Sequence, residues 1–462
     1  MFPVFRHRAG TAMISEVGLD IVLSVLAVLL AAFTVHAPPL GTAFRALVDP
    51  LLLLFACGFA ASLVLLQSGL GMYRAQEQGW IEQLLRLAVA VAMGSYLTYL
   101  MLKVVDFGEH PRVLVGYAAT YYILGLLIVR GVMLLRRELK GPPRVLIVGT
   151  GPDAELLADD MRGASRTDRI VAGFYPVTLE TLGEGASPLF AIGAPLPDLV
   201  RAYAIDEIVV AVRDHRRGLP LDDLLQCRSM GVRVHDVAGF YEMTHAEFPL
   251  ESLKASWLIY GPGFVQGEVR STLKRIFDIG VSGTLLILTL PVMALTALAI
   301  KLESRGPVIY KQERVGLLGR PFTCLKFRSM VVDAERDGVA RWASRNDARV
   351  TRVGRFIRDT RIDELPQLYS VLRGDMSMVG PRPERPAFVA RLKEQIPFYD
   401  LRHTVKPGLT GWAQVRYTYG DTLDAARRKH QFDLYYVKNN SLLLDLMVLV
   451  ETISVVLFRE GQ

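Results

Sequence analysis

The sequence predicts a membrane protein with three parts. These are a bundle of four transmembrane helices, a cytosolic doubly wound α/β domain, and an α-rich C-terminal domain anchored by a bent membrane helix. Hydrophobic residues make up 51% of the 462 residues and charged residues only 21%, whereas soluble domains carry about 25% charged residues. The apolar residues gather in long runs, and a strand-and-helix pattern follows the fourth run. The expected segments are 1–140, 141–260, 270–305 and 306–462.

Composition and charge exclude several functional classes. Disorder, collagen-like repeats and a disulfide scaffold do not fit this balance of apolar and charged residues. The three cysteines lie far apart without a Cys-x-x-Cys pair, which argues against zinc and fits a reducing cytosol. A net charge of +7 suits anionic lipid or phosphate-bearing substrates. It would also suit nucleic acid, but the hydrophobicity does not, so we expect no nucleic-acid partner.

Four apolar runs crowd the first third of the chain, each near the roughly 20 residues that cross a bilayer. They are Ile21–Val35, Pro50–Ser68, Ile81–Leu102 and Val113–Val129. Buried core helices of a soluble protein are the alternative. Seven Lys and Arg residues lie before the first run, between the second and third, and from the end of the fourth to Lys140, against three in the other two loops. This bias predicts that the N-terminus and everything after Lys140 lie in the cytosol.

An α/β pattern begins at Arg144. Arg144–Val148 is a predicted buried strand, followed by the glycine-rich turn Gly149–Ala154 and a helix. Ile205–Val212 and Gly231–Asp236 are predicted as later strands. Strands that alternate with helices favour a doubly wound α/β domain.

A fifth apolar run, Ile279–Ile300, has Pro291 in its middle. Basic residues flank both ends, with Lys274 and Arg275 before it and Lys301 after it, whereas a spanning helix shows this bias at one end. A central proline bends a helix. We therefore expect a helix that enters and leaves the membrane by the same face. The alternative is a plain fifth span, which would export the segment after it.

The last apolar stretch, residues 441–458, contains Asp445 and Glu451. Two acids argue against a spanning helix, so a docked or interfacial helix is expected.

Two adjacent carboxylates, Asp363 and Glu364, stand at the predicted start of a short helix that runs to Leu372. Pro366 sets this start, because proline is tolerated only in the first turn. Neighbouring helical residues point about 100° apart, so the two acids are expected to have different roles. As single residues they also fit an N-cap aspartate and a first-turn glutamate that pairs with arginine.

Cations flank these acids in the sequence and suggest chemistry on a phosphate. An ionised aspartate needs no base to act as a nucleophile, but it repels an anionic phosphate. A divalent cation on Glu364, with Arg358 and Lys326 nearby, would offset this repulsion. The pattern indicates phosphoryl transfer through an intermediate of the aspartyl-phosphate type.

Four ordered motifs make the segment recognisable. They are Lys326–Met330 (KFRSM), Asp363–Leu368 (DELPQL), Gly374–Pro383 (GDMSMVGPRP) and Lys406–Gln414 (KPGLTGWAQ). These motifs resemble the bacterial sugar transferase family, the polyprenyl-phosphate hexose-1-phosphate transferases or monotopic phosphoglycosyl transferases. The whole layout is similar to the long form of that family, with four spans, a Rossmann-like module and a catalytic domain.

The resemblance implies an activity and assigns residues to it. A UDP-sugar, with UDP-glucose or UDP-galactose the usual case, would donate its sugar-1-phosphate to undecaprenyl phosphate and release UMP. Asp363 would attack the β-phosphate, and Glu364 would help to bind Mg²⁺. The residues expected to bind phosphate or nucleotide are Lys326, Arg328, Arg358, Arg361, Pro381, Arg382 and Pro383.

Two positions depart from the family pattern. Leu290 precedes Pro291 where the family has serine before the proline that bends its re-entrant helix. The bend by proline is therefore kept, but the hydrogen bond of the serine is not. Many members have serine where Arg361 stands, which alters anion affinity near the nucleophile.

The resemblance also implies a setting. The enzyme would lie in the bacterial inner (cytoplasmic) membrane with its catalytic domain on the cytosolic face, where a soluble donor meets a lipid acceptor at the bilayer. Its product would start exopolysaccharide, capsule or O-antigen synthesis, and a homodimer is compatible with the sequence.

Two other functions compete with this one. The Gly149–Ala154 turn is close to a dinucleotide-binding fingerprint, as a membrane-tethered NAD-dependent nucleotide-sugar dehydratase would have. However, the predicted strand Ile170–Phe174 ends without the acidic residue that binds a ribose. A non-catalytic membrane scaffold would need polar residues inside its spans, and the first four runs show few.

Overall fold

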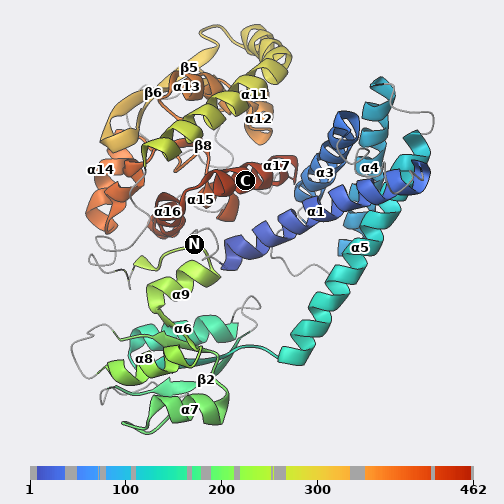
Figure 1. Ribbon diagram of the computed structural model, residues 1–462. Coiled ribbons are helices and arrows are strands. Elements are labelled where there is room, and N and C mark those ends of the chain that lie inside the picture. Colours follow the sequence, from blue (N-terminus) through green and yellow to red (C-terminus); the bar gives the residue numbers. More distant parts are fainter. Residues whose placement is uncertain are drawn as a thin grey trace. The chain divides into compact units, whose positions relative to one another are not determined.

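The chain folds into two compact units, Met1–Ala246 and Glu247–Gln462 (Figure 1). The computed structural model describes residues 8–36, 49–70, 72, 80–105, 111–163, 169–177, 189–212, 219–250, 253, 267–332, 349–417 and 422–458. The predicted boundary at residue 140 falls inside the first unit. The predicted boundary at residue 260 lies outside the described residues.

Four long helices open the first unit: α1 (Arg8–His36), α3 (Pro50–Gly69), α4 (Trp80–Val104) and α5 (Pro111–Lys140). The Asp49 side chain starts α3 by accepting a hydrogen bond from the Leu51 amide at 3.0 Å. The inward side chains share one core, which includes Val28, Phe55, Leu63 and Leu126. Many outward leucines and valines are exposed, a surface that suits lipid rather than water.

Five described helices contain segments long and apolar enough to cross a membrane. They are Glu16–Val35, Pro50–Ser68, Leu84–Val104, Pro111–Val132 and Glu268–Glu303. The first four coincide with the four apolar runs predicted from the sequence. Length and composition of these helices therefore fit a membrane protein.

Polar side chains meet inside the group of N-terminal helices. The Tyr122 hydroxyl donates to Asp20 Oδ1 at 3.0 Å and accepts from Gln67 Nε2 at 2.7 Å. All three residues are buried. The sequence shows few polar residues in these spans, but it does not show that three of them meet. Folding brings Tyr122 to Asp20, 102 residues away, and to Gln67, 55 residues away, so that three helices share the cluster.

A four-stranded parallel sheet follows, in the order β2-β1-β3-β4. Its strands are β1 (Arg144–Val148), β2 (Ile170–Tyr175), β3 (Glu207–Val210) and β4 (Arg233–Asp236), and the helices are α6 (Pro152–Gly163), α7 (Leu196–Tyr203), α8 (Leu221–Ser229) and α9 (Val237–Thr244). Leu146 and Val148 of β1 face one core, whereas Val145 and Ile147 face the other. Both faces of the sheet are covered, which explains why the four residues of β1 after Arg144 are all apolar.

The second unit begins with one long helix and continues with short elements. Its helices are α11 (Glu268–Glu303), α12 (Arg352–Asp359), α13 (Gln367–Arg373), α14 (Pro386–Gln395), α15 (Trp412–Arg416), α16 (Leu423–Asn439) and α17 (Leu442–Phe458). Its 3₁₀ turns are η3 (Leu317–Gly319), η4 (Ile362–Glu364) and η5 (Tyr399–Thr404). Strands β5 (Ile309–Val315) and β6 (Pro321–Phe327) pair antiparallel, and β7 (Ser377–Val379) and β8 (Gly408–Thr410) pair parallel.

Helix α11 contains Pro291, and its axis changes direction along its length (Figure 1). Apolar side chains in its middle are largely exposed, such as Ile287 at 75% and Leu295 at 69%. Near its two ends, Asp278 and Ile300 are buried against the rest of the second unit. The helix is thus held at both ends, and an apolar middle part projects from the unit.

Close backbone crossing joins two of the sequence motifs. The Gly380 amide donates to the Thr410 carbonyl at 2.9 Å, and the Gly408 amide donates to the Pro381 carbonyl at 3.0 Å. A Cβ on Gly380 would lie 2.3 Å from the Lys406 carbonyl oxygen, and a Cβ on Gly408 would lie 2.1 Å from the Gly380 nitrogen. Only glycine allows this approach, which brings the two motifs together.

Helix α17 docks on its unit through its two acids. Asp445 forms an ion pair with Lys274 at 2.8 Å, and Glu451 forms one with Arg416 at 2.7 Å. Both acids are buried. This confirms the docked helix that the two acids predict.

Candidate active site

Asp363 and Glu364 lie in η4, a single 3₁₀ turn that precedes α13. The predicted continuous helix from Asp363 to Leu372 is therefore wrong in one respect. Pro366 has no N–H to continue the turn, so it caps a second helix instead. The predicted stop is confirmed, since Gly374 ends α13 with a left-handed φ of 98°.

Arg361 makes the sharp bend that leads into η4. Its φ of 58° is left-handed, a conformation that costs a non-glycine residue roughly 1–2 kcal/mol. Its amide donates to the Arg358 carbonyl at 3.1 Å, and its carbonyl accepts from the Glu364 amide at 3.2 Å. Backbone strain of this kind is concentrated at functional sites.

Glu364 is held by two cations from distant parts of the chain. Lys326 Nζ of β6 donates to Glu364 Oε1 at 2.9 Å, and Arg382 Nη2 donates to the same oxygen at 2.7 Å. Glu364 Oε2 has one longer contact, with Arg382 Nη1 at 3.4 Å. The structure thus brings together three of the residues that the sequence singled out.

Asp363 is buried like Glu364, but its carboxylate is not engaged. Among the described residues, no side chain forms a hydrogen bond or ion pair with it. Arg358, Lys326 and Arg382 act on it through their charges. The adjacent acids therefore differ in their contacts: Glu364 is clamped, and Asp363 is not. The different roles that the sequence predicts for them stay a prediction.

The pKa values of the two acids move in opposite directions. Burial raises the pKa of the Asp363 carboxyl, and repulsion from Glu364 adds to it, giving about 6 although Lys326 and Arg382 oppose the rise. Burial also opposes ionisation of Glu364. The charges of Arg382 and Lys326 outweigh it and hold the pKa of Glu364 well below its usual range. A pair of acids separated in this way is typical of catalytic sites.

A close backbone contact places α12, which carries Arg358, beside the KFRSM segment. The Thr351 amide donates to the Ser329 carbonyl at 3.1 Å. A Cβ on Gly354 would lie 1.9 Å from that carbonyl oxygen. The sequence analysis missed Gly354, whose only signal is a glycine inside a short helix.

Two arginines that the sequence analysis missed bind the backbone of the Pro381–Pro383 loop. Arg402 Nη2 donates to the Arg382 carbonyl at 2.9 Å, and Arg314 Nη1 donates to the Pro383 carbonyl at 3.0 Å. These bonds fix the loop backbone and leave the Arg382 side chain directed at Glu364. Arg402 lies only a few residues before the KPGLTGWAQ motif, which is the one signal that could have found it.

Arg328 lies elsewhere in the unit. Its guanidinium donates to the carbonyls of Ser304 at 2.9 Å and Arg305 at 3.0 Å, just after α11 ends. In this arrangement Arg328 secures the C-terminal end of α11, and its predicted contact with phosphate stays a prediction. The predicted roles of Arg358, Arg361 and the buried Pro381 and Pro383 likewise stay predictions.

The acids at this site suit a magnesium ion that is shared with a substrate. No group of three or more His, Cys, Asp or Glu side chains converges among the described residues. Mg²⁺ is usually bound by one or two carboxylates together with water and substrate phosphates. Glu364 Oε2, which in the described part of the chain has only its 3.4 Å contact with Arg382, fits that donor set.

Comparison with known proteins identifies relatives of the second unit. The sequence model of the family described as bacterial sugar transferase matches residues 269–459. Over 190 residues, the chain is 46% identical to the UDP-glucose:undecaprenyl-phosphate glucose-1-phosphate transferase of Caulobacter vibrioides, which covers 41% of this chain and 71% of that protein.

Two further relatives are matched over a smaller share of their length. The UDP-N-acetylgalactosamine-undecaprenyl-phosphate N-acetylgalactosaminephosphotransferase of Aeromonas hydrophila is 40% identical over 266 residues, 57% of this chain and 62% of that protein. The UDP-glucose:undecaprenyl-phosphate glucose-1-phosphate transferase of Escherichia coli is 46% identical over 187 residues, 40% of each chain. The chain belongs to the bacterial sugar transferase family.

Proposed function

We propose that this protein transfers a sugar-1-phosphate from a UDP-sugar to undecaprenyl phosphate. The observation that carries the proposal is the pair of acids: Asp363 is buried, raised in pKa and unengaged, and Glu364 beside it is clamped by Lys326 and Arg382. The names of the relatives support the substrate classes, with glucose and N-acetylgalactosamine among their sugars.

The reaction would proceed in two displacements at one phosphorus atom. In the first, an Asp363 oxygen bonds to the β-phosphorus of the donor. The bond from that phosphorus to the bridging oxygen breaks, and UMP leaves with the electron pair. In the second, a phosphate oxygen of undecaprenyl phosphate attacks the same phosphorus and releases the Asp363 carboxylate. Lys326, Arg358 and Arg382 would offset the negative charge on the phosphates during both displacements.

Magnesium is part of the proposal, with Glu364 as the protein residue that would hold it together with substrate phosphates. When bound, it would neutralise phosphate charge and so ease the approach of a carboxylate. We expect EDTA to abolish UMP release and added Mg²⁺ to restore it, with the thermal unfolding of the protein unchanged. Full turnover in EDTA, in protein shown to be metal-free, would contradict this role.

The rate of the first displacement should depend on pH through Asp363. Only the ionised carboxylate can attack, so a pKa of about 6 means that the active fraction falls to about one tenth at pH 5. An aspartate with the ordinary pKa of 3.8 would stay mostly ionised there. The measurement is the single-turnover rate constant of UMP release per unit concentration of subsaturating donor. Donor is used alone because a lipid phosphate also titrates near pH 6. A flat profile between pH 5 and 7 would contradict the raised pKa.

We further propose that α11 enters and leaves the bilayer by one face and that the second unit lies on the cytosolic side of the inner membrane. Both ends of α11 contact the same unit: Asp278 accepts from the Met378 amide at 3.1 Å, and Glu303 Oε1 accepts from the Arg352 amide at 2.8 Å. The exposed apolar middle and Pro291 lie between them. A straight helix of this length would separate its ends by roughly 54 Å.

The α/β part of the first unit gives less support to an NAD-dependent dehydratase. A Cβ on Gly149 would lie 2.8 Å from the Ala211 carbonyl oxygen, so packing within the sheet accounts for this glycine without a cofactor. Asp153 and Glu155 occupy the first turn of α6, where a dinucleotide would place its pyrophosphate, and like charges repel. We therefore propose that this Rossmann-like module has a regulatory or assembly role.

A screen of UDP-sugars tests the proposed function. Purified full-length protein with undecaprenyl phosphate would be given UDP-glucose, UDP-galactose or UDP-N-acetylgalactosamine, with UMP release and radiolabel in the lipid fraction as readouts. At least one donor should give both signals in equal amounts. UMP without labelled lipid would indicate hydrolysis, and neither signal with any donor would reject the proposal.

A further inference from the structure

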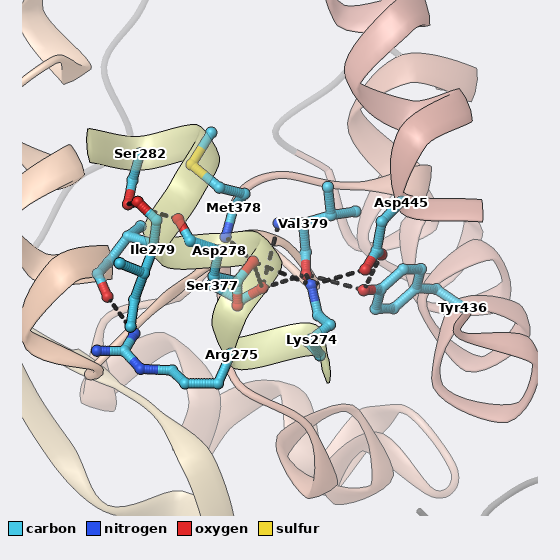
Figure 2. A network of polar contacts seen from close by, with 11 residues as sticks. Lys274, Arg275, Asp278, Ile279, Ser282, Ser377, Met378, Val379, Tyr436 and Asp445 are labelled. Carbon is cyan, nitrogen blue, oxygen red and sulfur yellow. Dashed lines mark hydrogen bonds and ion pairs between the residues drawn. The ribbon is translucent and has the colours of Figure 1, made fainter. Parts of the chain in front are cut away.

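One turn of α11, Lys274–Asp278, is bound to the protein rather than facing lipid phosphates. From the sequence alone, Lys274 and Arg275 are basic residues that flank a membrane segment. In the structure both side chains turn toward the protein and are only partly exposed (Figure 2). Lys274 and Asp278 point toward α17 and β7, whereas Arg275 leaves the turn on another side (Figure 2).

Arg275 binds the C-terminal end of the helix that follows the two catalytic acids. Its Nη1 donates to the Val371 carbonyl at 2.6 Å, and its Nη2 donates to the Leu372 carbonyl at 2.5 Å. These carbonyls belong to the last turn of α13, where a helix has few N–H groups of its own to offer them. The Val371 carbonyl also accepts from the Gly374 amide at 3.0 Å. A cation at this end also complements the helix dipole. A helix of seven residues is not stable alone and depends on such contacts.

The opposite end of α13 leads directly to the reacting carboxylate. The Leu368 amide donates to the Leu365 carbonyl at 3.0 Å, and the Leu365 amide donates to the Ile362 carbonyl at 3.2 Å. Although Pro366 divides them into two helices, η4 and α13 are thus linked through Leu365, and we call the linked pair the catalytic rod. Glu364 and Leu372 are eight residues apart, about 12 Å in a helix. A shift or rotation at the Arg275 end would therefore move the Asp363 carboxylate.

Asp278 and Lys274, from the same turn of α11, hold the strand β7 that leads to the Arg382 loop. Asp278 Oδ1 accepts from the Ser377 hydroxyl at 3.0 Å and from the Met378 amide at 3.1 Å. Lys274 Nζ donates to the Val379 carbonyl at 3.3 Å. These three residues form β7, which runs directly into the loop that carries Arg382. The Arg382 loop and η4 then contact each other through the ion pair of Arg382 with Glu364.

We propose that Arg275 is a positioning residue for the proposed transfer reaction. It ties the catalytic rod to the turn of α11 that also holds the Arg382 loop, and thereby sets the place of the Asp363 carboxylate. Asp278 and Lys274 provide the other attachment. The membrane helix would then be part of the active-site framework as well as an anchor. The proposal rests on the proposed function, and its first test does not need activity.

The test compares Arg275→Ala, Arg275→Lys and the matched control Lys301→Ala in full-length protein in detergent. Lysine keeps the charge but cannot donate to two carbonyls from one planar group. Lys301 lies at the other end of α11 and is exposed, so its loss removes a flanking charge without touching α13. Membrane insertion of each variant is measured first, as resistance to extraction with alkaline carbonate.

Amide hydrogen exchange without substrate is the first readout. We expect exchange in residues 367–375 to become at least about tenfold faster in Arg275→Ala and to rise by an intermediate amount in Arg275→Lys. Exchange in α12 should not change in either variant, and Lys301→Ala should match wild type. If both Arg275 variants match wild type in residues 367–375, the tie to α13 does not exist and the proposal fails.

Kinetics of UMP release from donor alone are the second readout. With donor alone each molecule releases UMP once, so the rate constant is that of a single turnover. A displaced nucleophile should lower this rate constant at saturating donor about tenfold or more in Arg275→Ala, with the half-saturating donor concentration within about twofold, and Arg275→Lys should lie between. The proposal would be overturned if Arg275→Ala lost activity only in proportion to its loss of membrane insertion and Arg275→Lys kept the wild-type rate. Arg275 would then act as a positive charge that sets the orientation of α11 in the membrane. Absence of UMP release in wild type would reject the proposed function instead, and the exchange result would still decide the tie.

Discussion

The Asp363→Asn variant should fold normally and lose UMP release by roughly 10³-fold or more. Asparagine is nearly the same size but carries no charge and is a poor nucleophile, so the first displacement stops. Folding should not suffer, since the Asp363 carboxylate has no hydrogen bond or ion pair among the described residues. Removing a buried charge of raised pKa is more apt to stabilise the site than to disrupt it.

Intact mass of the protein after incubation with donor alone gives a direct measurement. Wild type should gain the mass of a sugar phosphate, and Asp363→Asn should not. Asp400→Asn is a matched control, because this exposed acid lies in the same unit and its ion pairs with described residues are those with Lys393 and His403. An adduct of the same mass in Asp363→Asn would place the nucleophile on another residue.

The second large effect is expected for Glu364→Gln, which should lower both activity and stability. Glutamine leaves the charges of Lys326 and Arg382 without the carboxylate that binds both at 2.9 and 2.7 Å. Removing one partner of a buried ion pair costs about 3 kcal/mol of unfolding free energy. We expect kcat to fall at least about 100-fold, because Lys326 and Arg382 lose their fixed positions and the proposed magnesium ligand is weakened.

Glu451→Gln separates the two effects of Glu364→Gln. Glu451 is also buried and pairs with Arg416 at 2.7 Å, but it lies on α17 and not among the acids of η4. It should lower the thermal unfolding temperature by a similar amount while each folded molecule keeps its rate of UMP release. If Glu364→Gln instead destabilises the protein and leaves kcat unchanged, Glu364 has a purely structural role.

Features that depend on neighbours in the chain were predictable from the sequence. Pro50, Pro291 and Gly374 act through their own backbone conformations. The start of α3, the position of the proline inside α11 and the end of α13 could therefore be located. The four motifs also located the acids and Arg382. The single helix predicted from Asp363 was wrong because the missing N–H of Pro366 separates η4 from α13.

The supports of the site could not be predicted in this way. Arg275 reaches carbonyls 96 and 97 residues away, and Asp278 reaches an amide 100 residues away. Arg314 and Arg402 act through backbone carbonyls, which every residue has, so no particular residue type marks their partners. A sequence shows which side chains are present, but these roles depend on which backbone groups come within 3 Å.

The sequence alone determined which segments are apolar enough for a membrane and where two adjacent acids stand among cations. Both conclusions rest on residue type and local spacing. Only the tertiary structure decided which acid is held by cations and which is not. Charge pairing depends on distance in space, and folding brings Lys326 and Arg382 to Glu364 while leaving Asp363 without a partner among the described residues.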